Sequence, residues 1–122
     1  MSKRILIAED SSVIQNLTKK ILSAQNYNVV TVKNGKEVMD KVSSEVYDLV
    51  LLDIHMPIKD GMECAKEIRS NNKTMPIIAI TGNANNYTMD DFKKVGINDY
   101  LPKPLNYDQM VEMVKKYVEN AG

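Results

Sequence analysis

Short runs of apolar residues alternate along the chain with longer segments in which apolar residues recur every three or four positions. The short runs predict β-strands, and the longer segments predict amphipathic helices. Five strands are expected, over residues 4–9, 28–33, 48–53, 76–81 and 98–101. The first, third and fourth are apolar throughout and suit the centre of a sheet, whereas the mixed composition of the second suits an edge.

Five helices are expected between and after these strands. Ser11 or Ser12 caps the first helix, and its core-facing stripe is expected to consist of Val13, Ile14, Leu17, Ile21 and Leu22. A second helix opens at Asn34-Gly35 and turns inward Val38, Met39 and Val42. A third follows a loop over residues 57–61 and ends at 71–72. The last two are expected over about 85–94, ending at Gly96, and over about 107–119.

Alternation of strands and helices is typical of a parallel sheet with helices on both faces. Right-handed crossovers then favour an α/β fold of the flavodoxin-like (βα)5 type, with the strand order 2-1-3-4-5. In such a fold a crevice lies outside the carboxyl ends of the first and third strands. Candidate functional residues are therefore sought at that edge of the sheet.

Chemically reactive side chains stand where the predicted strands end. Glu9 and Asp10 end the first strand, Asp53 ends the third and Thr81 ends the fourth. Lys103 follows the fifth strand and stands between two prolines. Because parallel strands share one carboxyl edge, three acids, one hydroxyl and one amine are expected to converge there.

Three carboxylates packed together repel one another unless their pKa values rise or a cation neutralises them. Oxygen ligands without histidine or cysteine side chains favour a hard cation, Mg²⁺ first, with Mn²⁺ as an alternative. A carboxylate is also a nucleophile toward phosphorus, so Asp53 is a candidate for an aspartyl phosphate. The metal would offset the phosphoryl charge, while Lys103 would pair with the phosphoryl oxygens and Thr81 would donate a hydrogen bond.

Length and charge narrow the classes of function. The 122 residues predict one domain, spanning 1–122, without an output domain. Sixteen basic and 16 acidic residues balance, which argues against direct binding of nucleic acid or an anionic membrane by bulk charge. The lone Cys64 excludes an internal disulfide, and no apolar run suits a secretory signal or a membrane span, so a cytoplasmic location is expected.

Four motifs, in this order and over almost the whole chain, resemble those of the receiver domains of two-component response regulators. They are Glu9-Asp10, Asp53 with Met56-Pro57 and Asp60-Gly61, Thr81-Gly82, and the run Tyr100-Leu101-Pro102-Lys103-Pro104. The resemblance implies a phosphorylation-dependent switch in a two-component system or phosphorelay. It also implies a phosphohistidine donor, supplied by a histidine kinase or a histidine phosphotransfer protein.

The resemblance further implies a set of metal ligands. Asp10, Asp53 and the backbone carbonyl of His55 would hold Mg²⁺, and Glu9 would contribute directly or through water. The side chain of His55 is the only imidazole in the chain. It is expected to be exposed in a loop rather than to act as a catalyst.

The remaining roles implied by the resemblance concern phosphate binding and signal transmission. Lys103 would contact the phosphate and precede a cis-proline at Pro104. Thr81 and Tyr100 would form a switch pair, although Tyr100 would also suit a fixed core position. The surface of the fourth helix, fifth strand and fifth helix would then change its preference for a downstream protein.

Two other classes of protein share either similar catalytic residues or the same fold. A metal-dependent phosphohydrolase of the haloacid dehalogenase type would carry a second acid two residues after the nucleophile, where this chain has His55, and usually a cap domain. A flavin-binding module would share the fold, but Glu9 and Asp10 would repel the flavin phosphate.

Within the signalling class, a stand-alone regulator and a relay domain of a hybrid kinase both stay open. The stretch 81–85 resembles hybrid-kinase receivers.

Overall fold

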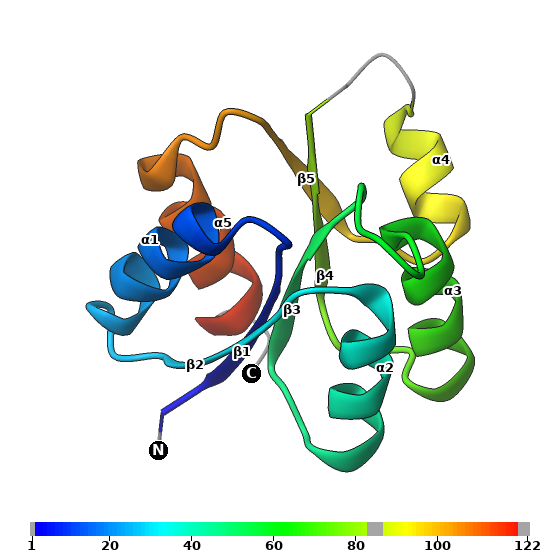
Figure 1. Ribbon diagram of the computed structural model, residues 1–122, viewed down its shortest axis with the longest axis horizontal. Coiled ribbons are helices and arrows are strands. Elements are labelled where there is room, and N and C mark those ends of the chain that lie inside the picture. The colour runs from blue at the N-terminus through cyan, green and yellow to red at the C-terminus, as the bar shows by residue number, and fades with distance from the viewer. Residues whose placement is uncertain (1, 83–86, 120–122) are drawn as a thin grey trace.

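The computed structural model describes residues 2–82 and 87–119. Its centre is a five-stranded parallel sheet with the order β2-β1-β3-β4-β5, which confirms the predicted topology (Figure 1). Every strand lies within a residue of its predicted bounds. The strands are β1 (Arg4–Ala8), β2 (Asn28–Val32), β3 (Leu49–Asp53), β4 (Ile77–Thr81) and β5 (Asp99–Pro102).

Within the described ranges, five helices cover the sheet in two layers. Figure 1 shows two helices on one face, α1 (Ser12–Ser23) and α5 (Tyr107–Glu119). The opposite face carries α2 (Gly35–Ser44), α3 (Gly61–Asn71) and α4 (Met89–Lys94). Among the residues that the structure describes, no helix is long and apolar enough to cross a membrane.

The central strands contribute side chains to two hydrophobic cores, because successive side chains of a strand point to opposite faces of the sheet. The core beneath α2, α3 and α4 receives Leu6, Ala8, Val50 and Leu52. The core beneath α1 and α5 receives Ile5, Ile7, Leu49 and Leu51. This double burial explains why β1, β3 and β4 are apolar except for one residue at an end of each, Arg4, Asp53 and Thr81. The mixed strand β2 is an edge strand, as predicted.

Helix α1 buries only part of the stripe that its sequence predicts: Leu22 is buried and Ile21 packs against the core, but two other members are exposed. Val13 and Leu17 are 78% and 44% exposed, whereas the buried positions include two polar residues, Gln15 and Thr18. Both polar side chains donate to backbone carbonyls, Gln15 to those of Glu9 and Val32 and Thr18 to that of Ile14. These bonds satisfy the two buried polar groups, so their burial is tolerated. The buried face of α1 is therefore rotated about the helix axis relative to the apolar face that the sequence predicts.

Helix α4 is shorter than predicted. It begins at Met89, because Thr88 caps it and forms a reciprocal pair of hydrogen bonds with Asp91. Tyr87 and Thr88 are not helical, and the first two positions of the predicted helix, 85 and 86, lie outside the described residues. The helix ends near Gly96, as expected, and this glycine has a φ of +87°.

Candidate acidic site at the carboxyl edge of the sheet

Three acidic side chains meet at the carboxyl ends of β1 and β3. Strands β1 and β3 are neighbours, and Ala8 pairs with Leu52, so the residues that follow this pair lie side by side. Carboxylate oxygens of Glu9, Asp10 and Asp53 consequently all lie within 4.8 Å of one another. The structure thus brings together the three acids that the sequence predicted at this edge.

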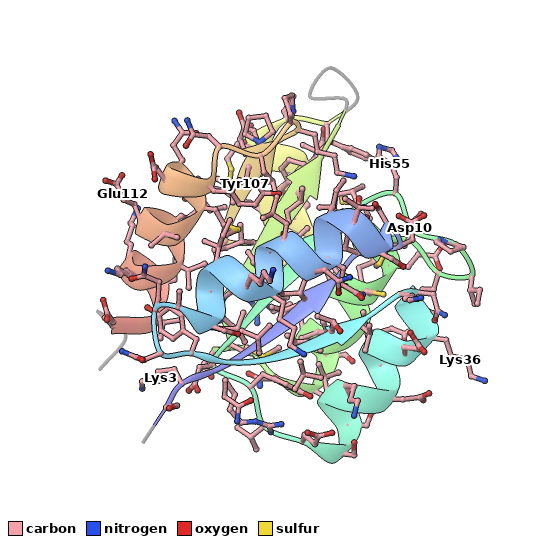
Figure 2. All side chains as sticks on the ribbon, turned by 60° about the vertical axis from the view of Figure 1, so that its left-hand side comes forward. Lys3, Asp10, Lys36, His55, Tyr107 and Glu112 are labelled. Atoms are coloured by element: carbon pink, nitrogen blue, oxygen red, sulfur yellow. The ribbon has the colours of Figure 1, made fainter. Side chains whose placement is uncertain are left out.

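The three carboxylates differ in their exposure to solvent. Asp53 is fully buried and Glu9 is 2% exposed, whereas Asp10 is exposed. Figure 2 shows Asp10 and His55 at the same end of the molecule, both at its surface. The cluster therefore has a buried floor and a side that faces solvent, as a site for an incoming ligand requires.

Lys103 supplies the positive charge of the site. Its Nζ lies 2.9 Å from Oδ2 of Asp53 and 3.8 Å from Oε1 of Glu9. The backbone N–H of Lys103 donates to the carbonyl of Thr81 at 2.8 Å, which fixes the end of β5 to the end of β4. The peptide bond between Lys103 and Pro104 is cis.

The loop after β3 holds the second oxygen of Asp53. The backbone N–H of His55 donates to Oδ1 of Asp53 at 3.0 Å, and the His55 side chain is exposed. Gly61 closes this loop, since its N–H donates to the carbonyl of Ile54 at 3.0 Å. A Cβ at Gly61 would lie 2.7 Å from the carbonyl oxygen of Asp53, so only glycine fits this close approach.

Effects of opposite sign act on the pKa of Glu9. Burial raises the pKa of Glu9 to about 7, and the charge of Asp53 and a hydrogen bond with Asp10 act in the same direction. The N–H of Ser11, which donates to Oε2 at 2.9 Å, and the charge of Lys103 lower this pKa. The other oxygen, Oε1, is buried and accepts no hydrogen bond from the residues that the structure describes.

One ammonium group faces three carboxylates, so the site holds an excess of negative charge. Burial alone would lower the pKa of Lys103, but its hydrogen bond to Asp53 and the neighbouring acidic charges raise it above the ordinary lysine value. Oxygen ligands this close together, one of them an orphaned buried oxygen, are the donors that a hard divalent cation needs. The residues present therefore fit a divalent metal.

Of the two predicted switch residues, Thr81 lies beside this site and Tyr100 lies further along β5. Thr81 is buried at the end of β4 and follows Ile80, which pairs with Asp53 in the sheet. Tyr100 is half-buried, and its ring centroid lies 5.6 Å from that of Phe92 in α4. Tyr100 thus packs against α4 in this conformation.

A model of the response regulator receiver domain matches residues 5–115. The chain belongs to this family. Receiver domains are phosphorylation-dependent switches of two-component signalling, and this membership confirms the signalling class over the phosphohydrolase and flavin-binding alternatives.

Named relatives support the same assignment. The receiver domain is 35% identical, over 96% of its length, to hybrid signal transduction histidine kinase I of Dictyostelium discoideum. A CheY-like receiver domain protein from Methanospirillum hungatei has a TM-score of 0.93 and 29% identity, with 99% of this chain and 97% of that chain covered. The receiver domain of sensor histidine kinase PA1611 from Pseudomonas aeruginosa has a TM-score of 0.88 and 30% identity, with 98% and 99% covered.

The PA1611 structure contains a magnesium ion coordinated in its active-site cleft. The present chain spans 5% to 17% of the length of three sensor and hybrid kinases to which it is similar. Sequence similarity to these kinases thus concerns one domain of much longer proteins.

One supporting residue of this receiver domain was not predicted. Gln15 is buried, and its amide donates to the carbonyls of Glu9 and Val32 at 3.1 Å and 2.9 Å. These bonds hold the chain where β1 passes into α1 and so position Glu9. No feature of the sequence identifies this glutamine, because a single polar residue in a helix is usually solvated.

Proposed function

We propose that this receiver domain accepts a phosphoryl group on Asp53 from the phosphohistidine of a histidine kinase or a histidine phosphotransfer protein. The observation that carries the proposal is the fully buried Asp53 carboxylate, held 2.9 Å from Lys103 within the acidic cluster. In the reaction an Asp53 oxygen forms a bond to phosphorus as the phosphorus–nitrogen bond breaks. The donor imidazole leaves with the electron pair of that bond and takes up a proton.

Mg²⁺ is the proposed metal, with Mn²⁺ as an alternative. Asp10, Asp53 and the backbone carbonyl of His55 would hold the ion, and Glu9 would contribute directly or through water. When bound, the ion supplies positive charge against the phosphoryl oxygens. The close carboxylates and the orphaned oxygen of Glu9 support this ligand set.

Lys103 and Thr81 are proposed to bind the phosphoryl oxygens. Lys103 already lies against Asp53 and would exchange this contact for one with a phosphoryl oxygen, which keeps its charge at the reacting centre. The hydroxyl of Thr81 would donate to a second oxygen by drawing the end of β4 toward Asp53. Tyr100 would then turn inward, leave its packing against Phe92 and alter the surface formed by α4, β5 and α5.

The phosphoryl donor is proposed to dock beside α1. Val13 and Leu17 expose apolar surface there, and a hollow of about 430 Å³ lies next to them, lined by Ile14, Lys103, Pro104, Leu105 and Tyr107. Because Lys103 belongs both to this lining and to the acidic site, a partner seated in the hollow would stand next to Asp53. An apolar patch bordering the reactive site suits a protein donor.

Phosphorylation of Asp53 is testable by intact mass. The metal-free protein is incubated with acetyl phosphate or a phosphorylated histidine kinase, with and without Mg²⁺. We expect a phosphoryl adduct in wild type only when Mg²⁺ is present, because the unneutralised acids repel the anionic donor. Asp53→Asn should not form the adduct.

Asp40→Asn is the matched control, since Asp40 is an exposed aspartate of α2 outside the cluster. This variant should be labelled like wild type. Labelling of Asp53→Asn at the wild-type rate would assign the phosphoryl group to another residue and overturn the proposal. Equal labelling of wild type in EDTA would overturn the metal requirement alone.

A further inference from the structure

A groove between the carboxyl ends of α3 and α4 gathers five basic side chains. Its volume is about 500 Å³, and its charged lining consists of Lys66, Arg69, Lys73, Lys93 and Lys94. Val95 and Gly96 complete the lining, so no acidic residue of the described chain takes part. Since the chain has a formal net charge of 0, this basic groove is a local concentration of charge.

Arg69 forms the fixed floor of the basic groove. Its guanidinium donates to the carbonyls of Gly96 and Asn72 at 2.7 and 2.9 Å, and to the side-chain oxygen of Asn98 at 2.8 Å. All three acceptors are neutral, and burial lowers the pKa of Arg69. A Cβ at Gly96 would lie 2.2 Å from Cγ of Arg69, so this close packing requires the glycine.

The four lysines around this floor are exposed. None of them lies within 4.0 Å of a carboxylate in the part of the chain that the structure describes, in contrast to Lys41, Lys59 and Lys103. Lys94 does act on Asp91 of its own helix, where its charge adds to a lowering of the pKa that the N–H of Thr88 mainly causes. The charge of the basic groove is therefore largely uncompensated within the chain.

Stabilisation of helix ends explains only part of this arrangement. Arg69, Lys93 and Lys94 stand in the last turns of α3 and α4, where cations interact favourably with the helix dipole. Lys66 lies earlier in α3, and Lys73 lies in the loop beyond it. Three separate segments thus direct like charges to one groove, although like charges repel. An anionic ligand would relieve that repulsion.

We propose that the basic groove binds an acidic segment of a partner protein, in which several aspartate or glutamate side chains lie close together. Lysine ammonium groups on flexible stems adapt to carboxylates in many geometries. Each nitrogen of the Arg69 guanidinium already donates one hydrogen bond, and the side formed by Nε and Nη2 is occupied, which disfavours bidentate recognition of a phosphate. Among the described residues, no aromatic side chain lines the basic groove to stack with bases.

The basic groove is separate from the acidic site. Helices α3 and α4 end at the amino edge of the sheet, whereas Asp53 lies at the carboxyl edge. A partner bound to the groove would leave Asp53 open to its phosphoryl donor. The inference therefore goes beyond the proposed function and does not rest on it.

Binding is tested by fluorescence anisotropy with a labelled polyglutamate peptide at low and at physiological salt. The test variant combines Lys66→Gln, Lys73→Gln and Lys93→Gln, and keeps Lys94 because of its interaction with Asp91. We expect wild type to bind the peptide and the test variant to bind about tenfold more weakly, since each exposed ion pair contributes a modest share. The remaining binding should depend less on salt.

The matched control combines Lys3→Gln, Lys19→Gln and Lys36→Gln, which removes the same charge from exposed lysines outside the basic groove. Figure 2 shows Lys3 and Lys36 far from each other on the surface. The control should weaken binding by less than about twofold, because screening limits the reach of exposed charges. Melting curves of both variants verify that each is folded.

Three results would overturn the proposal. The first is an equal loss of affinity in both triple variants, which would indicate attraction by bulk charge. The second is an absence of peptide binding by wild type at low salt. The third is tighter binding of duplex DNA of unrelated sequence than of polyglutamate, with the same dependence on the three lysines, which would make the basic groove a nucleic-acid site.

Discussion

At the scale of single residues, Glu9 links the acidic site to stability. Its pKa is about 7 in the folded protein, mainly because of burial, against an ordinary value of 4.5. Between these values the folded state holds a proton that the unfolded state releases, so the protonated carboxyl favours folding at low pH. The free energy of unfolding of the metal-free protein should therefore fall as the pH rises from 4.5 to about 7.

Urea unfolding in EDTA across this pH range measures the effect. Glu9→Gln keeps the shape of the side chain without its titration, so its stability should change less with pH than that of wild type. Glu45 does not interfere, because its hydrogen bonds to Arg4 and Lys41 lower its pKa to about 2, and it titrates below this window. Parallel pH profiles for wild type and Glu9→Gln would contradict the prediction.

The positions of the acidic residues could be predicted from the sequence for a simple reason. An apolar run reveals where a buried strand ends, and parallel strands bring all their carboxyl ends to one edge, so Asp53 and Lys103 had to lie near each other. Gln15 could not be predicted, because its value to the site comes from two carbonyls that only the fold brings within its reach.

At the scale of elements, α1 shows where hydropathy fails. The apolar pattern assigns Val13 to the buried face, but a hydrogen-bonded Gln15 occupies that face and Val13 is exposed. A buried polar side chain is compatible with a core when its hydrogen bonds are satisfied, and exposing a single valine to solvent reduces the stability of the fold only slightly. Hydropathy therefore located the helix and, with Leu22, part of its buried side, but it wrongly assigned Val13 and Leu17 to that side.

Substitutions in α1 should follow the structure rather than the hydropathy. Gln15→Leu is expected to destabilise the protein by about 1–3 kcal/mol, because the buried carbonyl of Glu9 loses its hydrogen bond. Val13→Ser should change stability by less than about 0.5 kcal/mol, since this side chain is exposed. Urea unfolding of both variants provides the measurement. A larger loss for Val13→Ser than for Gln15→Leu would mean that α1 buries the predicted face.

At the scale of the whole molecule, the topology followed from the alternation of strands and helices alone, since right-handed crossovers leave few arrangements of five parallel strands. The basic groove could not be predicted in the same way. Lys66 and Lys93 are distant in the sequence, and each by itself has the appearance of a solvated helix residue. Only the packing of α3 beside α4 places them on one surface.

The proposed coupling between Asp53 and the surface of α4, β5 and α5 predicts different defects for two residues of the site. Thr81→Ala should accept a phosphoryl group but show smaller phosphorylation-dependent NMR shifts over residues 87–107, because no hydroxyl draws the end of β4 inward. The rate at which Lys103→Ala is labelled should be about 100-fold lower than that of wild type, because the positive charge next to Asp53 is lost.

Thr81→Ser is the control that separates the hydroxyl from the shape of the side chain, since serine keeps the donor without the methyl group. Its shifts should resemble those of wild type. Wild-type shifts in phosphorylated Thr81→Ala would show that the signal reaches Tyr100 without this hydroxyl, even though Asp53 accepts the phosphate. Small shifts in both Thr81 variants would instead point to the packing of the threonine methyl, and the hydrogen bond would then not be the source of the coupling.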